Sequence, residues 1–341
     1  MAAFKCFKFS FSQLFLPSLL VFHALGFPLQ RLRSLEIIRE INSKGPYLGL
    51  ITVYSLEEDA FFSSGVFEPD SQNPFLDLSG RRFRVGKLQR KEVIYVKCGV
   101  GMVNAAAATQ QMLDLFNIEG LIHFGISGNL NSSMNIGDVV IPNQFANTGL
   151  WDWLKPDAQV PKNDFAKLEV KEYNVPRGGN SSLGMIGYRA EQFYSDAGEV
   201  DTAQQMLWFN VTSNWLQLAS ALQGLELDKC VNSSLCLVNK PKVVLGMKAS
   251  TANIFLDNGA YRNFLFQTFG VSSADMESTA VVMTSLSNGF PVLVIRGLSD
   301  LAGAQEGQNS IHLFGSLAAS NVAKVVIQFI NLLPNTFYRH S

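Results

Sequence analysis

Apolar runs of two kinds alternate along the chain from Tyr47 onward. Short runs rich in β-branched and aromatic residues predict strands at 47–54, 82–85, 93–97, 120–124, 137–141, 242–247 and 291–296. Longer runs predict helices at 104–116, 203–222, 258–269, 276–286 and 313–333. Strands that alternate with helices of this length predict an α/β domain with a largely parallel or mixed sheet.

One segment departs from this alternation. From about 148 to 237 the chain is rich in Asn, Gly, Ser, Trp and Tyr. Because no Pro/Gly-rich linker separates it from the rest, we interpret it as a long surface insertion and not as a second domain.

The first 26 residues have the layout of a secretory signal peptide. Lys5 and Lys8 precede an interrupted apolar stretch, and the small residues Ala24 and Gly26 follow it. We therefore expect residues 1–26 to be removed and 27–341 to form the mature domain. No other segment reaches about 18 consecutive apolar residues, so no membrane association is expected after removal of the signal.

Composition narrows the classes of function. The chain has 341 residues, of which 47% are hydrophobic and 16% charged, with a net charge of −1. That apolar content excludes a disordered chain. The absence of a basic excess argues against nucleic-acid binding through phosphate contacts.

Sequons and cysteines agree with passage through the secretory pathway. The acceptor asparagines for N-glycosylation are Asn131, Asn180, Asn210 and Asn232. Cys230 and Cys236 bracket a short polar loop and are expected to form a disulfide in an oxidising compartment. Cys98 is expected to be a buried apolar thiol and not a nucleophile. No His/Cys spacing suggests a metal site.

Two glycine-rich turns follow predicted strands. Gly99-Val-Gly101 is followed by Asn104 where a dinucleotide fingerprint has its third glycine, and it comes after a hairpin, so a Rossmann cofactor site is disfavoured. The second turn includes Gly125 and Ser127. Because ligands of open α/β sheets lie beyond the carboxyl ends of strands, the two turns predict a crevice there.

Carboxylates stand at three further strand ends or helix starts. They are the run Glu57-Glu58-Asp59, the segment Asp275-Met-Glu277, and Asp300. Any one of them is equally well explained as a helix cap. Separate carboxylates are also what acid/base cleavage of a glycosyl bond requires.

Taken in order, these segments resemble the nucleoside phosphorylase superfamily. The resemblance rests on Gly49-Leu-Ile51, Leu56-Glu-Glu-Asp59, Cys98-Gly-Val-Gly101, Phe124-Gly-Ile-Ser-Gly128, Ile136-Gly-Asp138, Met276-Glu277 and Ser299-Asp300. Within that superfamily, the chain is similar to the methylthioadenosine/S-adenosylhomocysteine nucleosidase branch. It resembles plant bark and vegetative storage proteins more closely still, in the segments His123-Phe-Gly-Ile-Ser-Gly-Asn129, Thr148-Gly-Leu-Trp-Asp-Trp153, Cys230-Val-Asn-Ser-Ser-Leu-Cys236 and Ser299-Asp-Leu-Ala-Gly303. The resemblance covers about residues 45–335 and implies a single three-layer α/β domain with a central mixed β-sheet flanked by helices.

The resemblance also implies catalytic roles. Asp300 would help to protonate the purine base as it leaves, which requires a raised pKa. Met276 and Glu277 would contact the ribose. The acid that orients the attacking water aligns best with Asp59, which is one methylene shorter than the usual Glu, and the neighbouring Glu57 is the alternative.

Further contacts with the substrate are implied for a larger set of residues. Ile254 and Phe255 would form the apolar wall around the base and Phe314 would cover it, although core packing explains Ile254 equally well. The remaining expected contacts are Gly99, Gly125, Ser127 and Ser299.

The usual phosphate-binding arginine and Ser/Thr are absent, since His123-Phe124 and Ile126 stand at those places. Water is therefore slightly favoured over inorganic phosphate as the nucleophile, and glycine-turn amides leave phosphate open as a co-substrate. No other cofactor is expected.

Three functions remain open from the sequence. The first is a secreted or vacuolar plant enzyme that cleaves the N-glycosidic bond of purine-type nucleosides. The second is a storage protein with the same fold and little or no catalysis, and a nucleoside-binding protein without catalysis is a weaker third. The partners expected are a small-molecule nucleoside and further copies of the chain in a homo-oligomer.

Overall fold

The computed structural model describes residues 33–155, 166–170, 183–303 and 308–334. The chain divides into two units after Lys44. In the first unit, residues 33–44 form a helix. The second unit begins at Gly45 and contains all of the elements described below. The predicted signal peptide at 1–26 lies outside the described residues.

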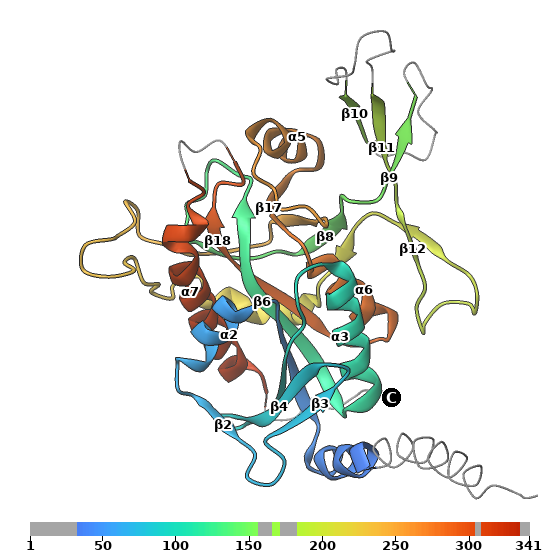
Figure 1. The fold of residues 1–341 in the computed structure, drawn as a ribbon, viewed down its shortest axis with the longest axis vertical. Helices are drawn as coiled ribbons and strands as arrows, with labels where there is room; N and C mark the ends of the chain where they lie inside the picture. The colour runs from blue at the N-terminus through green and yellow to red at the C-terminus, as the bar shows by residue number, and fades with distance from the viewer. Residues whose placement is uncertain (1–32, 156–165, 171–182, 304–307, 335–341) are drawn as a thin grey trace, which may run out of the picture. The chain divides into compact units, whose positions relative to one another are not determined.

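A large mixed sheet forms the centre of the second unit (Figure 1). Within the described part of the chain it contains thirteen strands, with the path β14-β8-β16-β17-β6-β1-β5-β4-β2. These strands are β1 (Tyr47–Thr52), β2 (Phe67–Pro69), β4 (Arg81–Leu88), β5 (Lys91–Lys97), β6 (Ile118–Asn129), β8 (Gln144–Asn147), β14 (Phe209–Asn210), β16 (Lys248–Thr251) and β17 (Val271–Asp275). The strands off this path are β3 (Phe75–Leu78), β7 (Val139–Ile141), β15 (Val243–Leu245) and β18 (Val292–Asp300).

Strand directions confirm the mixed sheet. Strand β6 runs parallel to both β1 and β18, and β1 is also parallel to β5. Strands β4 and β5 form the expected antiparallel pair, and β17 is antiparallel to β6. The parallel strands therefore end at a common edge of the sheet.

Helices cover both faces of the sheet and give the expected α/β architecture. Figure 1 shows α2 (Ser55–Phe62) and α7 (Ile311–Leu332) on one side of β6, and α3 (Met102–Leu115) and α6 (Ser278–Ser287) on the other. Ala318 and Ala319 of α7 pack against Ile126 of β6, in contact with apolar side chains of α2. The remaining helices are α4 (Ser213–Ala219), the 3₁₀ turn η2 (Ser220–Leu222) and α5 (Gly259–Phe269).

Two of the central strands are buried along their whole length. All six residues of β1 and all nine of β18 are buried. Strands buried on both faces are near-continuous apolar runs, which is why β1 and β18 are easily predicted from sequence. Among the described residues, α7 alone has the length and hydropathy of a membrane span, but 61% of its most apolar window is buried inside the structure. We therefore assign α7 as a core helix.

Two elements differ from the sequence-based prediction. Helix α2 follows directly after β1, where only an acidic run was expected. The predicted helix at 203–222 was wrong over its first half, since β13 (Gln204–Met206) and β14 lie there and helix begins at Ser213. Phe209 pairs with Phe145 of β8 and is fully buried. Sheet pairing thus outweighs the local helical pattern.

Residues 148–237 contribute both to smaller sheets and to the main packing. Strands β9 (Trp151–Leu154), β10 (Ala166–Val170) and β11 (Gly184–Tyr188) form a three-stranded antiparallel sheet, and β12 (Glu191–Phe193) pairs with β13. In the same segment, Trp215 of α4 is fully buried against Phe329 of α7.

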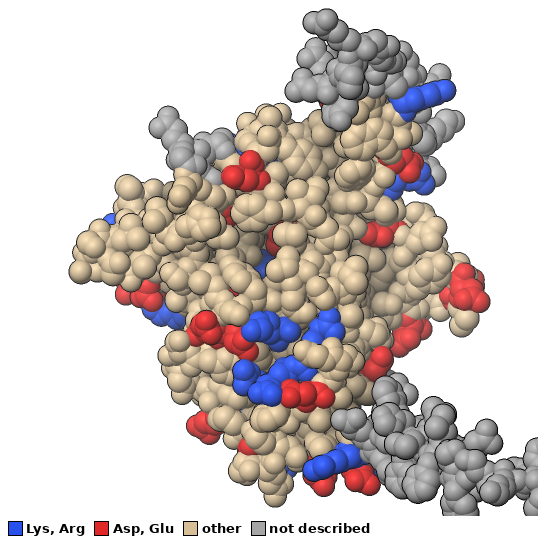
Figure 2. Space-filling model, viewed as in Figure 1, with Lys and Arg blue, Asp and Glu red and all other residues tan. Residues whose placement is uncertain are grey.

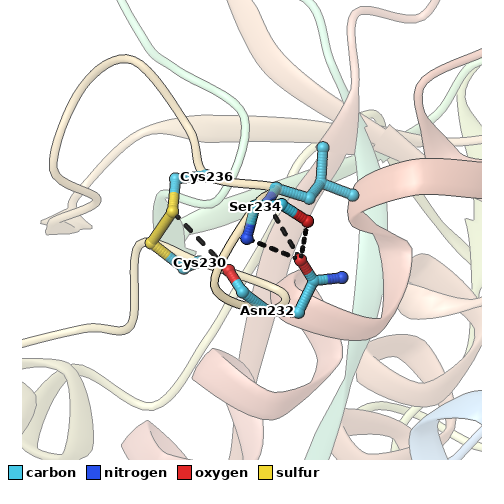
Figure 3. The surroundings of a disulfide bond; sticks show 5 residues. Cys230, Asn232, Ser234 and Cys236 are labelled. Carbon is cyan, nitrogen blue, oxygen red and sulfur yellow. Dashed lines mark hydrogen bonds between the residues drawn. A yellow bond between two sulfur atoms is a disulfide. The ribbon is translucent and has the colours of Figure 1, made fainter.

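A disulfide joins Cys230 and Cys236 and closes a short loop that contains one of the sequons (Figure 3). The side chain of Asn232 is exposed, and its Oδ1 accepts hydrogen bonds from the backbone of Ser234 and Leu235 and from the Ser234 hydroxyl. Its amide nitrogen, the atom that carries a glycan, makes no hydrogen bond to the described residues. Cys98 is buried and is a free thiol.

The sequons differ in accessibility, which leads to a prediction. Asn131 is only 8% exposed, and its Nδ2 donates to Ser272. Asn180 lies outside the described residues. We expect a glycan on the exposed Asn232 and none on Asn131, because an attached glycan needs its amide nitrogen in solvent. After expression through a secretory pathway, Ser234→Ala should remove the mass of one glycan and Ser133→Ala should remove none. A glycosylated Asn131 peptide in mass spectrometry would contradict this.

Candidate functional site

A cavity of about 290 Å³ opens at the carboxyl edge of the sheet. It is lined by the ends of β6, β17 and β18 and by the segments that follow β1, β5 and β16, as expected for a ligand site in an open α/β sheet. Its polar lining groups are Tyr54, Glu57, Ser127, Asp275, Glu277, Ser299 and Asp300. Its apolar lining includes Val53, Val100, Ile126, Ile254, Phe255, Leu256, Met276 and Ile311.

Arg296, in the middle of β18, holds three of these acids together. Its guanidinium is completely buried and lies 3.2 Å from Asp275, 3.5 Å from Glu277 and 3.9 Å from Glu57. Burial alone would lower the pKa of Arg296, but these carboxylates hold it above its usual value. We call Arg296 with Glu57, Asp275 and Glu277 the ion cluster.

His123 fixes the orientation of the Arg296 guanidinium. Burial lowers the pKa of His123 to about 3, and the nearby Arg296 adds to that effect, so the ring is neutral. Its Nε2 accepts a hydrogen bond from Arg296 Nη2, which leaves Nδ1–H to donate to the backbone oxygen of Ile51 at 3.0 Å. A neutral imidazole can satisfy both bonds in only one tautomer.

Glu57 reaches the cavity because it lies in the first turn of α2, which begins soon after β1 ends. One carboxylate oxygen accepts a hydrogen bond from the Val53 backbone N–H at 2.7 Å, and the other accepts one from Ile126 N–H at 2.8 Å. Burial raises the pKa of Glu57, while Arg296 and these backbone donors oppose the rise. Gly125 makes room for this arrangement, since a Cβ there would lie 2.0 Å from Glu57 Oε1 and 2.7 Å from Arg296 Nη1.

Asp275 and Glu277 have different roles at the start of α6. Asp275 accepts hydrogen bonds from the backbone N–H groups of Glu277 and Ser278 and from the Ser278 hydroxyl. Burial would raise the pKa of Asp275, but Arg296 and the Ser278 hydrogen bonds outweigh it and lower the pKa. Glu277 instead accepts one backbone bond, from Gly101 at 2.8 Å, and burial raises its pKa to about 7.

Asp300 ends β18 on the other side of the cavity. Burial raises its pKa, and hydrogen bonds from Ser299 and Asn309 partly oppose the rise. The Ser299 hydroxyl donates to Asp300 Oδ1 at 2.7 Å, and Asn309 Nδ2 lies 3.3 Å from Oδ2. A buried carboxyl with a raised pKa is suited to deliver a proton.

Most of the residues predicted to form the site lie in this cavity. They are Met276, Glu277, Ser299, Asp300, Ile254, Phe255 and Ser127. The hydroxyl of Ser127 is buried and has no hydrogen-bond partner among the described residues. It is therefore available to a ligand in the cavity.

Four predicted residues do not line the cavity. Asp59 is exposed on α2, two residues from Glu57, and about 200° of helix rotation separates the two side chains. Phe314 lies one turn beyond Ile311, which takes the lining position on α7. Gly125 stands behind Glu57, and Gly99 lines an adjoining cavity.

The sequence alone assigns no site role to Arg296, His123 or Asn309. Arg296 stands there only as the last residue of the predicted strand at 291–296. A charged residue inside a run that is otherwise fully buried is a signal that could have identified it, because a buried charge needs partners.

Comparison with known proteins assigns the chain to a family. A model of the phosphorylase superfamily matches residues 49–331. The chain belongs to the phosphorylase superfamily. It is also 35% identical over 289 residues to bark storage protein A of Populus deltoides, an alignment that covers 84% of this chain and 89% of that protein.

Nucleosidases of the phosphorylase superfamily are similar to this chain in sequence and in fold. The 5′-methylthioadenosine/S-adenosylhomocysteine nucleosidase of Geobacillus kaustophilus is 25% identical over 262 residues, which cover 76% of this chain and 88% of that enzyme. The crystal structure of the Helicobacter pylori nucleosidase with butyl-thio-DADMe-Immucillin-A superposes with a TM-score of 0.60 at 16% identity. That match covers 85% of this chain and all of the other, and it shows a shared fold.

Proposed function

We propose that this protein cleaves the N-glycosidic bond of purine nucleosides. The observation that carries the proposal is that Asp300 at the end of β18 and Glu277 at the start of α6, each with a raised pKa, line one cavity. Asp300 protonates the departing base. Glu277 binds the ribose hydroxyls and stabilises the positive charge that develops on the sugar. The family's nucleosidase members are consistent with this chemistry.

We further propose that water is the nucleophile, oriented by Glu57. The cavity is lined by four carboxyl groups, and the buried Arg296 is already engaged by three of them. A phosphate dianion entering this cavity would meet like charges and no free cation within the described residues. A neutral water meets no such penalty.

A panel of nucleosides tests the proposal. Adenosine, inosine, methylthioadenosine and cytokinin ribosides are incubated with the glycosylated protein, with and without inorganic phosphate, and free base is measured by chromatography. Release of base together with free sugar in phosphate-free buffer is the expected result. Sugar 1-phosphate as the product would assign phosphate as the nucleophile, and no base release would refute catalysis.

Storage without catalysis is the second candidate function, because the chain is 35% identical to a bark storage protein. It predicts bulk seasonal accumulation in the tissue that makes the protein and no base release in the same panel. Binding of the panel nucleosides without turnover, measured by calorimetry, would instead support a nucleoside-binding protein.

Two of the three acids of α2, Glu57 and Asp59, give a matched pair of variants. Glu57→Gln should lower base release roughly 10²–10⁴-fold, as expected for the loss of a general base. The substitution also removes one hydrogen bond, because the new side-chain amide N–H is a donor and faces the backbone N–H of either Val53 or Ile126, which is also a donor. Asp59→Asn, on the exposed face of the same helix, should leave the rate unchanged. If Asp59→Asn alone lowered base release, Asp59 and not Glu57 would be the residue that orients the attacking water.

We also propose that the protein forms a homo-oligomer through the apolar rim of the cavity. Val100 and Phe255, which line the cavity, are 52% and 58% exposed, and Val103, three residues after Val100 in the first turn of α3, is 79% exposed. Exposed large apolar side chains can mark interaction surfaces. Light scattering should show an oligomer that Val103→Glu dissociates and that Val238→Glu, 90% exposed in another segment, does not. A wild-type monomer would contradict the proposal.

We propose that residues 1–26 direct the protein into the secretory pathway. N-terminal sequencing of the mature protein should give a start near residue 27. A mature chain that begins at Met1 would exclude the signal peptide, and with it the apoplast and vacuole.

A further inference from the structure

A second cavity, of about 430 Å³, adjoins the first and differs from it in charge. Val53, Tyr54 and Val100 line both cavities. The second cavity contains Arg81 and Lys97 and has no acidic residue in its lining. The first contains four carboxyl groups.

The positive charge of the second cavity is only partly neutralised. Lys97 donates to Glu58 at 2.5 Å, but Glu58 is also 3.3 Å from Arg84 and so serves two cations. Arg81 donates to the backbone oxygen of Cys98 and to Asn104 Oδ1, both uncharged acceptors, and no ion pair of Arg81 occurs among the described residues. Figure 2 shows Lys and Arg side chains gathered on the face that carries α2 and the β3–β4 hairpin.

The position of this cavity relates it to one end of a bound nucleoside. Asp300, which takes the base in the proposed function, does not line it. Glu277, which takes the ribose, accepts its hydrogen bond from Gly101, next to Val100. Val100 therefore lies where the ribose end of the first cavity meets the second cavity, and Asp300 lines the first cavity only. A group attached to the sugar on the side opposite the base would enter it.

We infer that the second cavity binds an anionic group on the 5′ carbon of the nucleoside, so that the preferred substrates are purine nucleosides with an anionic 5′ substituent such as a phosphate ester. The inference rests on the proposed function for the orientation of the ligand. Arg81 supplies a planar donor held in place by its two neutral acceptors, and Lys97 supplies a second charge. These two residues act in binding and not in cleavage of the bond.

The test compares adenosine with adenosine 5′-monophosphate. The wild-type protein should have the higher kcat/KM for the monophosphate. Arg81→Gln and Lys97→Gln should each reduce that preference about tenfold, the loss expected from one charge-assisted hydrogen bond, and leave kcat/KM for adenosine unchanged. Arg82→Gln is the matched control, because Arg82 pairs with Asp77 on the other face of the same strand. Equal preference in wild type and both variants would overturn the inference.

Binding separates this inference from the proposed function. Calorimetry with both ligands is run on the wild type and on the Arg81→Gln variant in parallel with turnover. Tighter binding of the monophosphate, lost in Arg81→Gln, without any base release would keep the inference and refute catalysis. Equal binding of the two ligands would refute the inference even in an active enzyme.

Inorganic phosphate is the other anion that this cavity could hold, and it gives a different result. Under our inference, phosphate competes with adenosine 5′-monophosphate and does not accelerate cleavage of adenosine. If phosphate accelerates adenosine cleavage and Arg81→Gln abolishes the acceleration, the cavity binds the co-substrate and the inference is wrong.

Discussion

Replacement of Asp300 by Asn is expected to abolish nearly all base release, with a fall of roughly 10²–10⁴-fold in kcat. The side chain keeps its shape and still accepts the Ser299 hydrogen bond at Oδ1, but an amide cannot deliver a proton to the departing base. Chromatographic assay of free base at saturating nucleoside measures the effect. Binding of the nucleoside should persist, since the apolar walls of the cavity are unchanged.

The neighbouring acid Asp257 supplies a control with its own signature. It is exposed, it does not line the first cavity, and its negative charge adds to the raised pKa of Asp300. Asp257→Asn should therefore lower the pKa of Asp300. A general acid must be protonated, so the fall in activity at rising pH should begin at a lower pH than in the wild type. If both variants abolished activity at every pH, Asp300 would have no special role as the acid.

Replacement of Arg296 by Met is expected to give the largest loss of stability. It leaves Glu57, Asp275 and Glu277 buried without their common cation. Removing one partner from a buried ion pair costs roughly 3–5 kcal/mol. Urea unfolding should show a lower midpoint with little change in slope, and the loss should shrink at low pH as the carboxyls take up protons.

A surface ion pair provides the comparison. Arg82 lies 2.8 Å from Asp77, with both side chains about half exposed. Arg82→Met should leave the unfolding midpoint nearly unchanged, because solvent and salt screen exposed pairs. Equal losses in the two variants would mean that the ion cluster contributes nothing beyond an ordinary surface pair.

His123 is expected to act through Arg296. His123→Phe removes the acceptor for Arg296 Nη2 and the donor to Ile51. We expect a loss of stability smaller than that of Arg296→Met, because the charge of Arg296 still faces its carboxylates. The two substitutions combined should cost no more than Arg296→Met alone, which a double-mutant cycle measures. Full additivity would show that His123 acts independently of Arg296.

The sequence predicts the central strands and long helices of this fold well, because burial on both faces makes most of β1 and the first four residues of β18 apolar. It predicts short elements poorly. Helix α2 has only eight residues, too few to be stable alone, and it forms because it packs against α7. Strand β14 exists because Phe209 pairs with β8, a contact that no local pattern records.

The candidate site shows a similar division. Asp300 and Glu277 stand at strand and helix ends, where sequence position alone predicts exposure to a crevice. The choice between Glu57 and Asp59 depends on the rotation of a helix that was not predicted. The role of Arg296 depends on partners that are far from it in sequence, and proximity of that kind appears only in the folded chain.

The ion cluster also affects how this fold can change function over generations. Arg296 and its carboxylates stabilise the folded chain, so mutations there would be removed by selection whether or not the protein catalyses a reaction. Asp300 acts as the general acid only in the proposed function, and it has no ion pair among the described residues. A lineage that came to use the chain as a nitrogen reserve could lose Asp300 and keep Arg296. Within such a lineage, the residue at position 300, and not the residues of the ion cluster, would distinguish the enzymes from the storage proteins.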